Sequence, residues 1–195
     1  MSVIRQLSLF GVEAAAPEPA DLAGLMAGSG HVTRLGGTAR VSIIVDHPWR
    51  ASVLVAECAR RGLVATCVST VDDHIGVRSA YSALLTPLAL AWTKGSVKRP
   101  PPGLLLDGRM LRLWVEAEGR NEGAGAYALP LGRGDEHTRE PLGAALAAVG
   151  LPAQLVTARA DGRSWYRIVG KRRISRLLEM IGEPPKQAPI DIWPM

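Results

Sequence analysis

An internal repeat limits the possible fold more than any other feature of this chain. The run at 61–65 (RGLVA) parallels the run at 149–153 (VGLPA) at a spacing of 88 residues. The first helices expected in the two halves, at 22–30 and 111–119, lie 89 residues apart. In a chain rich in Ala, Leu and Val, similar residues can recur by chance. The order of the expected helices and strands is therefore stronger evidence for a repeat than residue identity. This order of elements predicts two copies of one structural unit.

The first half predicts the order helix, hairpin, helix, hairpin, helix. Gly36-Gly37 joins two runs of alternating residues and Asp72-Asp73 joins two others, which is typical of hairpins. Asp21 is expected to cap the first helix. The expected elements are a helix at 22–28, strands at 31–35 and 38–45, a helix at 49–61, strands at 64–70 and 75–80, and a helix at 81–92.

The second half repeats this order. It predicts a helix at 111–117, a glycine-rich turn, a strand at 126–131, a helix at 138–149, a hairpin at 153–169 and a helix at 171–181. The fold class is therefore α+β, with two tandem αββαββα repeats and two antiparallel sheets related by a pseudo-twofold axis. The expected parts are a flexible tail (1–20), a first repeat (21–94), a basic proline-rich linker (95–104), a second repeat (105–182) and a proline-rich tail (183–195).

Alternation within the strands separates two sheet faces. In the first half, Arg40 and Ser42 alternate with Val41 and Ile43. In the second half, arginine and tryptophan at 163, 165 and 167 alternate with apolar residues at 166 and 168. The apolar positions are expected to meet helices, and the arginine-bearing positions suit solvent or phosphate groups.

The net charge of +5 and the pI near 9.7 favour a polyanionic partner, nucleic acid first and an anionic membrane second. A solvated basic surface is the alternative for the same residues, and Trp165 could stack on a base or simply pack. The residues expected to contact DNA are Arg40, Ser42, Arg78, Arg159, Arg163, Trp165, Arg167, Lys171 and Arg172.

Two cysteines and the lack of a basic-then-apolar leader pattern predict a reducing, cytoplasmic location associated with the nucleoid. The longest apolar run, at 83–92, is too short to span a bilayer. The histidines and cysteines show no metal-ligand spacing, and no phosphate-binding loop or nucleophile elbow is present. We expect a monomer with internal pseudo-symmetry and without a membrane partner.

The stretch 21–30 (DLAGLMAGSG) resembles the signature helix of the LAGLIDADG family, which includes homing endonucleases and the N-terminal domain of WhiA-type regulators. The resemblance implies that two signature helices pack together at the centre and that the two sheets lie over DNA. Gly24 and Gly28 are four residues apart, which allows close approach of the helix backbones. The residues expected at this helix contact are Leu22, Ala23, Gly24, Leu25, Ala27 and Gly28.

In family endonucleases an acidic residue before the last glycine of each signature helix binds the catalytic metal. Ser29 takes this position in the first repeat, and a neutral hydroxyl is a poor ligand for a hard divalent cation. Glu118 takes it in the second repeat (LRLWVEAEG). Since two-metal cleavage needs carboxylates from both helices, we expect a non-catalytic protein without a cofactor. The alternatives are a Mg²⁺-dependent DNA endonuclease that uses Glu118, with Glu116 beside it, and a WhiA-like DNA-binding regulator.

A second resemblance lies near the N-terminus, in the pentapeptide QLSLF. It resembles the motif by which bacterial polymerases and repair proteins bind the DNA sliding clamp, where leucine and phenylalanine enter an apolar pocket. The alternative is an N-terminal strand that packs on the protein's own core. Together with the basic sheets, the resemblance to the clamp-binding motif predicts a DNA-binding accessory protein that is recruited to the clamp in bacterial replication or repair. The clamp-binding residues are Gln6, Leu7, Ser8, Leu9 and Phe10.

Overall fold

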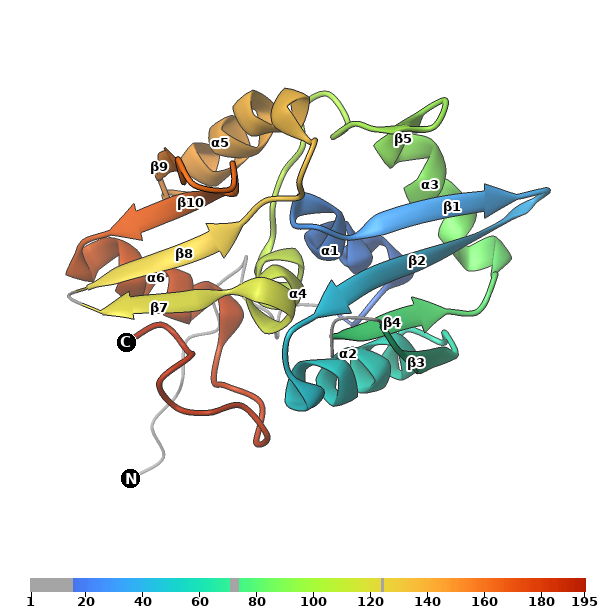
Figure 1. Cartoon of the computed structure of the whole chain (residues 1–195), viewed down its shortest axis with the longest axis horizontal. Helices are drawn as coiled ribbons and strands as arrows, with labels where there is room; N and C mark the ends of the chain where they lie inside the picture. The colour runs from blue at the N-terminus through green and yellow to red at the C-terminus, as the bar shows by residue number, and fades with distance from the viewer. Residues whose placement is uncertain (1–15, 71–73, 124) are drawn as a thin grey trace.

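Two four-stranded antiparallel sheets flank a central pair of helices in the computed structural model, which describes residues 16–70, 74–123 and 125–195 (Figure 1). The first sheet has the order β1-β2-β4-β3, with β1 (His31–Leu35), β2 (Thr38–Val45), β3 (Ala65–Ser69) and β4 (Ile75–Ser79). The second has the order β7-β8-β10-β9, with β7 (Arg120–Gly123), β8 (Ala126–Pro130), β9 (Gln154–Thr157) and β10 (Ser164–Val169). The same strand order occurs twice, which confirms the predicted α+β fold of two tandem repeats.

The helices cover one face of each sheet and meet at the centre (Figure 1). The central pair is α1 (Ala23–Ala27), preceded by the 3-10 turn η1 (Pro19–Leu22), and α4 (Gly108–Glu118). The first repeat adds α2 (Pro48–Arg60), η2 (Ala83–Leu85) and α3 (Thr86–Trp92), and the second adds η3 (Glu136–Thr138), α5 (Arg139–Ala148) and α6 (Lys171–Ile181). None of the helices in the described residues is long and apolar enough to cross a membrane.

The predicted alternation of sheet faces is present in both sheets. Val41 and Ile43 are buried under the helices, whereas Arg40 and Ser42 keep partial exposure on the other side of β2. In β10 the buried residues are Ser164, Tyr166 and Ile168. Each sheet therefore has a face covered by helices and a face without a helical layer, which we call the open face.

Two segments differ from the sequence prediction. The glycine-rich turn expected before β8 contains the strand β7, which pairs with β8 through an irregular register between Asn121 and Gly123. A short hairpin of β5 (Thr93–Lys94) and β6 (Val97–Lys98) extends from the end of the first repeat into the expected linker, and Lys98 is buried. Glycine and proline suggested irregular backbone in both places, but tertiary contacts order them.

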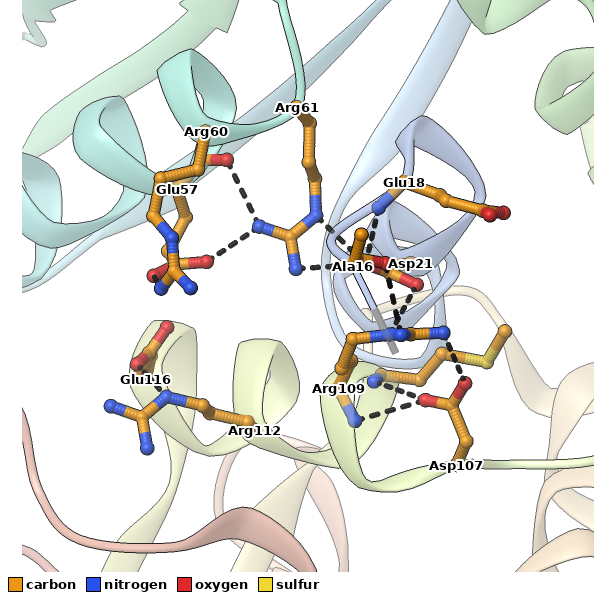
Figure 2. A network of polar contacts seen from close by, with 11 residues as sticks. Ala16, Glu18, Asp21, Glu57, Arg60, Arg61, Asp107, Arg109, Arg112 and Glu116 are labelled. Atoms are coloured by element: carbon orange, nitrogen blue, oxygen red, sulfur yellow. Dashed lines mark hydrogen bonds and ion pairs between the residues drawn. The ribbon is translucent and has the colours of Figure 1, made fainter. Parts of the chain in front are cut away.

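Asp21 does not take the N-cap position that the sequence predicted for it, although its carboxylate accepts the backbone N–H of Glu18 at 2.9 Å in a capping box. Asp21 lies within η1 and is 2% exposed, with Glu18 at the N-cap position of that turn. Its carboxylate contacts the guanidinium groups of Arg61 at 3.0 Å and Arg109 at 3.1 Å, so it joins three segments of the chain (Figure 2). The cap of α4 is Asp107, which accepts the backbone N–H groups of Arg109 and Met110.

Candidate nucleic-acid interface and central helix ends

The two central helices cross in close contact because the first one carries glycine at the crossing. A Cβ atom at Gly24 would lie 2.0 Å from the carbonyl oxygen of Met110, and one at Gly28 would lie 1.9 Å from Oε2 of Glu118. A side chain at Gly24 would push the two backbones apart, whereas one at Gly28 would displace the side chain of Glu118. The structure buries all the residues that the sequence assigned to this contact, namely Leu22, Ala23, Gly24, Leu25, Ala27 and Gly28.

At the C-terminal ends of these helices, the positions expected to be acidic lie next to each other. The backbone N–H of Ser29 donates a hydrogen bond of 2.8 Å to Oε2 of Glu118. Burial raises the pKa of Glu118 above its ordinary value, although the hydrogen bonds with Ser29 and the charges of Lys98 and Arg50 oppose that rise. The carboxylate therefore acts as an acceptor within the helix contact.

Glu116 belongs to a different environment. It is fully buried and its Oε1 lies 2.7 Å from Nε of Arg112. Burial raises the pKa of Glu116 to about 7, and the charge of Arg112 only partly offsets this rise. The charged groups that act on it are Arg112, Glu57 and Arg61, whereas Ser29 holds Glu118, so the two glutamates do not form one site.

Both central helices end on buried cations. The ammonium of Lys98 donates to the carbonyl oxygens of Gly28 at 2.8 Å and Gly30 at 3.3 Å, beyond the end of α1, and pairs with Asp135. The guanidinium of Arg50 donates to carbonyl oxygens at the end of α4, at 3.1 Å to Val115, 2.7 Å to Glu116 and 2.7 Å to Gly119.

These helix ends do not fit a divalent metal ion. Ser29 brings no charge, and Glu118 already accepts a backbone hydrogen bond. The carbonyl oxygens of Gly28 and Gly30 hold the ammonium of Lys98. In residues 16–70, 74–123 and 125–195, no group of three His, Cys, Asp or Glu side chains could hold a metal.

The open face of the first sheet brings together the three residues predicted there. Ser42 pairs in register with His31 on one side and Arg78 on the other, and Arg40 pairs with Thr33. The guanidinium carbon of Arg40 lies 4.8 Å from the ring centroid of Tyr81. Within the described strands, the positions on this face carry no carboxylate, so its two arginines are available to an anion.

The open face of the second sheet carries both signs of charge. Trp165 and Arg167 lie on it in β10, and Arg120 of β7 is in register with Arg167 through β8. Arg167 pairs with Glu122 at 2.7 Å. At the start of the strand, Arg163 pairs with Asp161 at 2.5 Å. This surface has less free positive charge than the first sheet. The sequence did not indicate Arg120 and Glu122 as surface residues of a strand, because the glycines beside them are typical of a turn.

Three predicted DNA-contacting residues lie elsewhere. Lys171 and Arg172 are exposed in the first turn of α6, which packs against α4 and β10 on the helix-covered side. Arg159 is exposed in the turn that follows β9. The structure therefore does not bring these three together with Arg167. The pentapeptide QLSLF at 6–10 lies outside the described residues.

No family model and no curated protein sequence matches this chain. Solved structures do match. The homing endonuclease I-WcaI bound to its DNA recognition sequence matches with a TM-score of 0.64, at 10% identity over 86% of this chain and 82% of that chain. The N-terminal LAGLIDADG domain of DUF199/WhiA matches with a TM-score of 0.61, at 16% identity over 95% and 97%. The chain has a LAGLIDADG-like fold. I-DmoI in complex with DNA and Ca matches this fold less closely, with a TM-score of 0.52 at 16% identity over 87% and 94%.

Proposed function

We propose that this protein binds duplex DNA on the open faces of its two sheets and does not cleave it. The observation that carries the proposal is the set of arginines Arg40, Arg78 and Arg167 on sheet faces that no helix covers. Arginine forms charge-assisted hydrogen bonds with phosphate groups, and the net charge of +5 adds a general attraction. I-WcaI, which has the same fold, was solved on its DNA recognition sequence.

The central helix ends support the proposed lack of cleavage. Phosphodiester cleavage by two metal ions requires carboxylates on both sides of the scissile phosphate. This chain offers Ser29 on one side, and on the other Glu118 is hydrogen-bonded within the helix contact. Binding by arginines needs neither carboxylate.

The test of DNA binding is a salt titration of affinity for a short duplex. The double variant Arg40→Ala with Arg78→Ala is expected to weaken binding about tenfold or more and to lower the slope of log K against log salt by about 2. Arg60→Ala on α2 removes one charge from the helix-covered side and serves as the control for general attraction. A flat salt dependence, or equal losses in both proteins, contradicts the proposal.

We further propose that the pentapeptide at 6–10 recruits the protein to the DNA sliding clamp in bacterial replication or repair. The support is the sequence QLSLF, since a short apolar segment can occupy a preformed pocket on a partner. A tether to a ring on DNA also raises the local concentration of the sheets near their ligand. Leu9→Ala with Phe10→Ala is expected to abolish co-purification of the clamp, and Ile4→Ala is the control. Unchanged co-purification rejects the tether.

The endonuclease alternative is favoured by one observation, the position of Glu118 at the end of the second central helix. It predicts nicking of duplex DNA with Mg²⁺ or Mn²⁺ that Glu118→Gln abolishes. The proposal above predicts no nicking by either protein. A WhiA-like regulator, the third candidate, predicts protection of one promoter sequence in a footprint, whereas a clamp-recruited protein binds without a fixed sequence.

A further inference from the structure

Each central helix ends on a cation that another part of the chain supplies. The carbonyl groups at a helix C-terminus lack partners within the helix and carry partial negative charge. Lys98 of β6 covers the end of α1, and Arg50 of α2 covers the end of α4. Both side chains are almost fully buried, so the charges act in a medium of low dielectric constant.

The two cations have aspartate partners at equivalent positions of the repeat. Arg50 pairs with Asp46 at 3.0 Å, and Lys98 pairs with Asp135. Asp46 and Asp135 are separated by the same 89 residues that separate Ser29 from Glu118. The helix ends and the aspartates are therefore at equivalent positions of the repeated unit, whereas the cations come from different elements, Arg50 from α2 and Lys98 from the hairpin between the repeats.

The direct polar contacts of the Lys98 ammonium are oxygen atoms, and its charge also acts on the imidazole of His31. Its ammonium contacts the carbonyl oxygens of Gly28 and Gly30 and the carboxylate of Asp135, and its charge also acts on Glu118. Backbone carbonyls and carboxylates are the ligands that hard divalent cations take in proteins. An ammonium is a compact point charge and can occupy a place of this kind.

We infer that Lys98 is a built-in substitute for a divalent metal ion at the end of α1. Its ammonium neutralises the oxygen atoms that a metal would bind, and its side chain fills the space that a metal would need. The native protein keeps its central helix contact without a metal, and removal of the Lys98 side chain leaves an oxygen-lined site that takes one. This inference does not depend on DNA binding.

The experiment compares thermal unfolding of the full chain with Mn²⁺ and with EDTA. The wild type is expected to melt at the same temperature in both. Lys98→Ala is expected to melt several degrees lower in EDTA and to recover much of that loss with Mn²⁺, and electron paramagnetic resonance is expected to count one bound Mn²⁺. Adding Asp135→Asn to Lys98→Ala removes a ligand and abolishes the recovery. Lys94→Ala, from the same hairpin but exposed, is the matched control.

Two results overturn the inference. One is a folded Lys98→Ala protein that binds no more Mn²⁺ than the wild type. The other is a wild type that binds Mn²⁺ and loses this binding in Glu118→Gln. If Lys98→Ala is unfolded in EDTA, refolding with and without Mn²⁺ decides: recovery of the native circular dichroism spectrum only with Mn²⁺ supports the inference, and equal yields overturn it.

Discussion

Ser29 and Glu118, which occupy equivalent positions of the two repeats, are joined by a hydrogen bond of 2.8 Å from the Ser29 backbone N–H to the Glu118 carboxylate. A carboxylate that accepts a partly buried backbone N–H satisfies a donor that has lost part of its access to water. The bond lies where Gly28 leaves room for it, since Oε2 of Glu118 would be 1.9 Å from a Cβ there. The end of this helix pair is therefore a structural contact.

The first prediction concerns the glycines at this crossing. Gly24→Ala forces a methyl group against the backbone carbonyl of Met110, which cannot move alone, and is expected to cost about 3 kcal/mol or more. Gly28→Ala meets the mobile end of Glu118 and is expected to cost less, about 1–2 kcal/mol, through the lost bond to Ser29. Urea denaturation measures both. Gly37→Ala, with no atom within 4 Å of its Cβ, is the control. Equal losses at positions 24 and 28 would contradict the account.

The second prediction concerns the buried carboxylate of Asp21, which contacts Arg61 and Arg109 (Figure 2). Asp21→Ala leaves two guanidinium groups with less compensation in a buried place and is expected to cost about 3–5 kcal/mol. Denaturant unfolding gives the value. Asp161→Ala removes an exposed partner of Arg163 and is expected to leave the unfolding midpoint unchanged. A similar midpoint for the two variants would show that the Asp21 pairs add little.

How much the sequence predicts depends on the range of the interactions involved. The strands at 31–35 and 38–45 and the helix at 171–181 agree with the structure to the residue, because their alternating or helical patterns are local. The sequence indicated that Asp21 lies at the start of the first helix but not its ion pairs, because Arg61 lies 40 residues away and Arg109 lies 88 away. An acidic residue at the start of a helix gives the same local sequence pattern whether or not it also pairs with distant arginines.

In the candidate site too, features that depend on local patterns were predictable and features that depend on distant contacts were not. Strand alternation predicted the open-face positions of Arg40 and Ser42, because it depends only on neighbouring residues. Lys98 could not be assigned, since nothing in a proline-rich segment indicates that it covers the end of a helix about 70 residues earlier in the chain. Arg120 had a weak signal in the charged run 120–122, which the flanking glycines obscured.

The third prediction concerns pH. Burial raises the pKa of Glu116 from 4.5 to about 7, so between these values the folded protein holds a proton that the unfolded chain releases. Stability is therefore expected to fall as pH rises through this window, by about 3 kcal/mol in all. Glu116→Gln cannot titrate and should flatten the profile of unfolding free energy against pH. Parallel profiles for the two proteins would assign the dependence to another group.

The fourth prediction concerns the ion pairs on the second open face, under the proposed DNA binding. Glu122 neutralises Arg167. Glu122→Gln is expected to tighten duplex binding several-fold and to steepen its salt dependence, because the freed guanidinium can contact a phosphate. Glu179→Gln on α6 makes the same charge change on the helix-covered side, where it pairs with Arg176, and is the control. An equal gain in both variants would indicate only a change in net charge.

The last prediction concerns the C-terminal segment at 183–195, which the sequence predicted as a proline-rich tail. In the structure this segment packs against the rest of the protein. Trp193 is 3% exposed, and its indole N–H donates to the carbonyl oxygen of Gly182 at 3.0 Å. The guanidinium carbon of Arg112 lies 5.4 Å from the indole centroid. Trp193→Ala is expected to cost about 3 kcal/mol or more, since it empties a buried site and removes the cation–π contact.

Ile190, in the same segment, is 76% exposed, so Ile190→Ala should leave the unfolding free energy unchanged. Limited proteolysis gives a second readout, because loss of the Trp193 anchor frees the end of the chain for cleavage while the repeats stay folded. Cleavage of Trp193→Ala after about residue 182 at a rate above that of Ile190→Ala supports the docking. If the two variants are cleaved and unfold alike, Trp193 does not hold the segment.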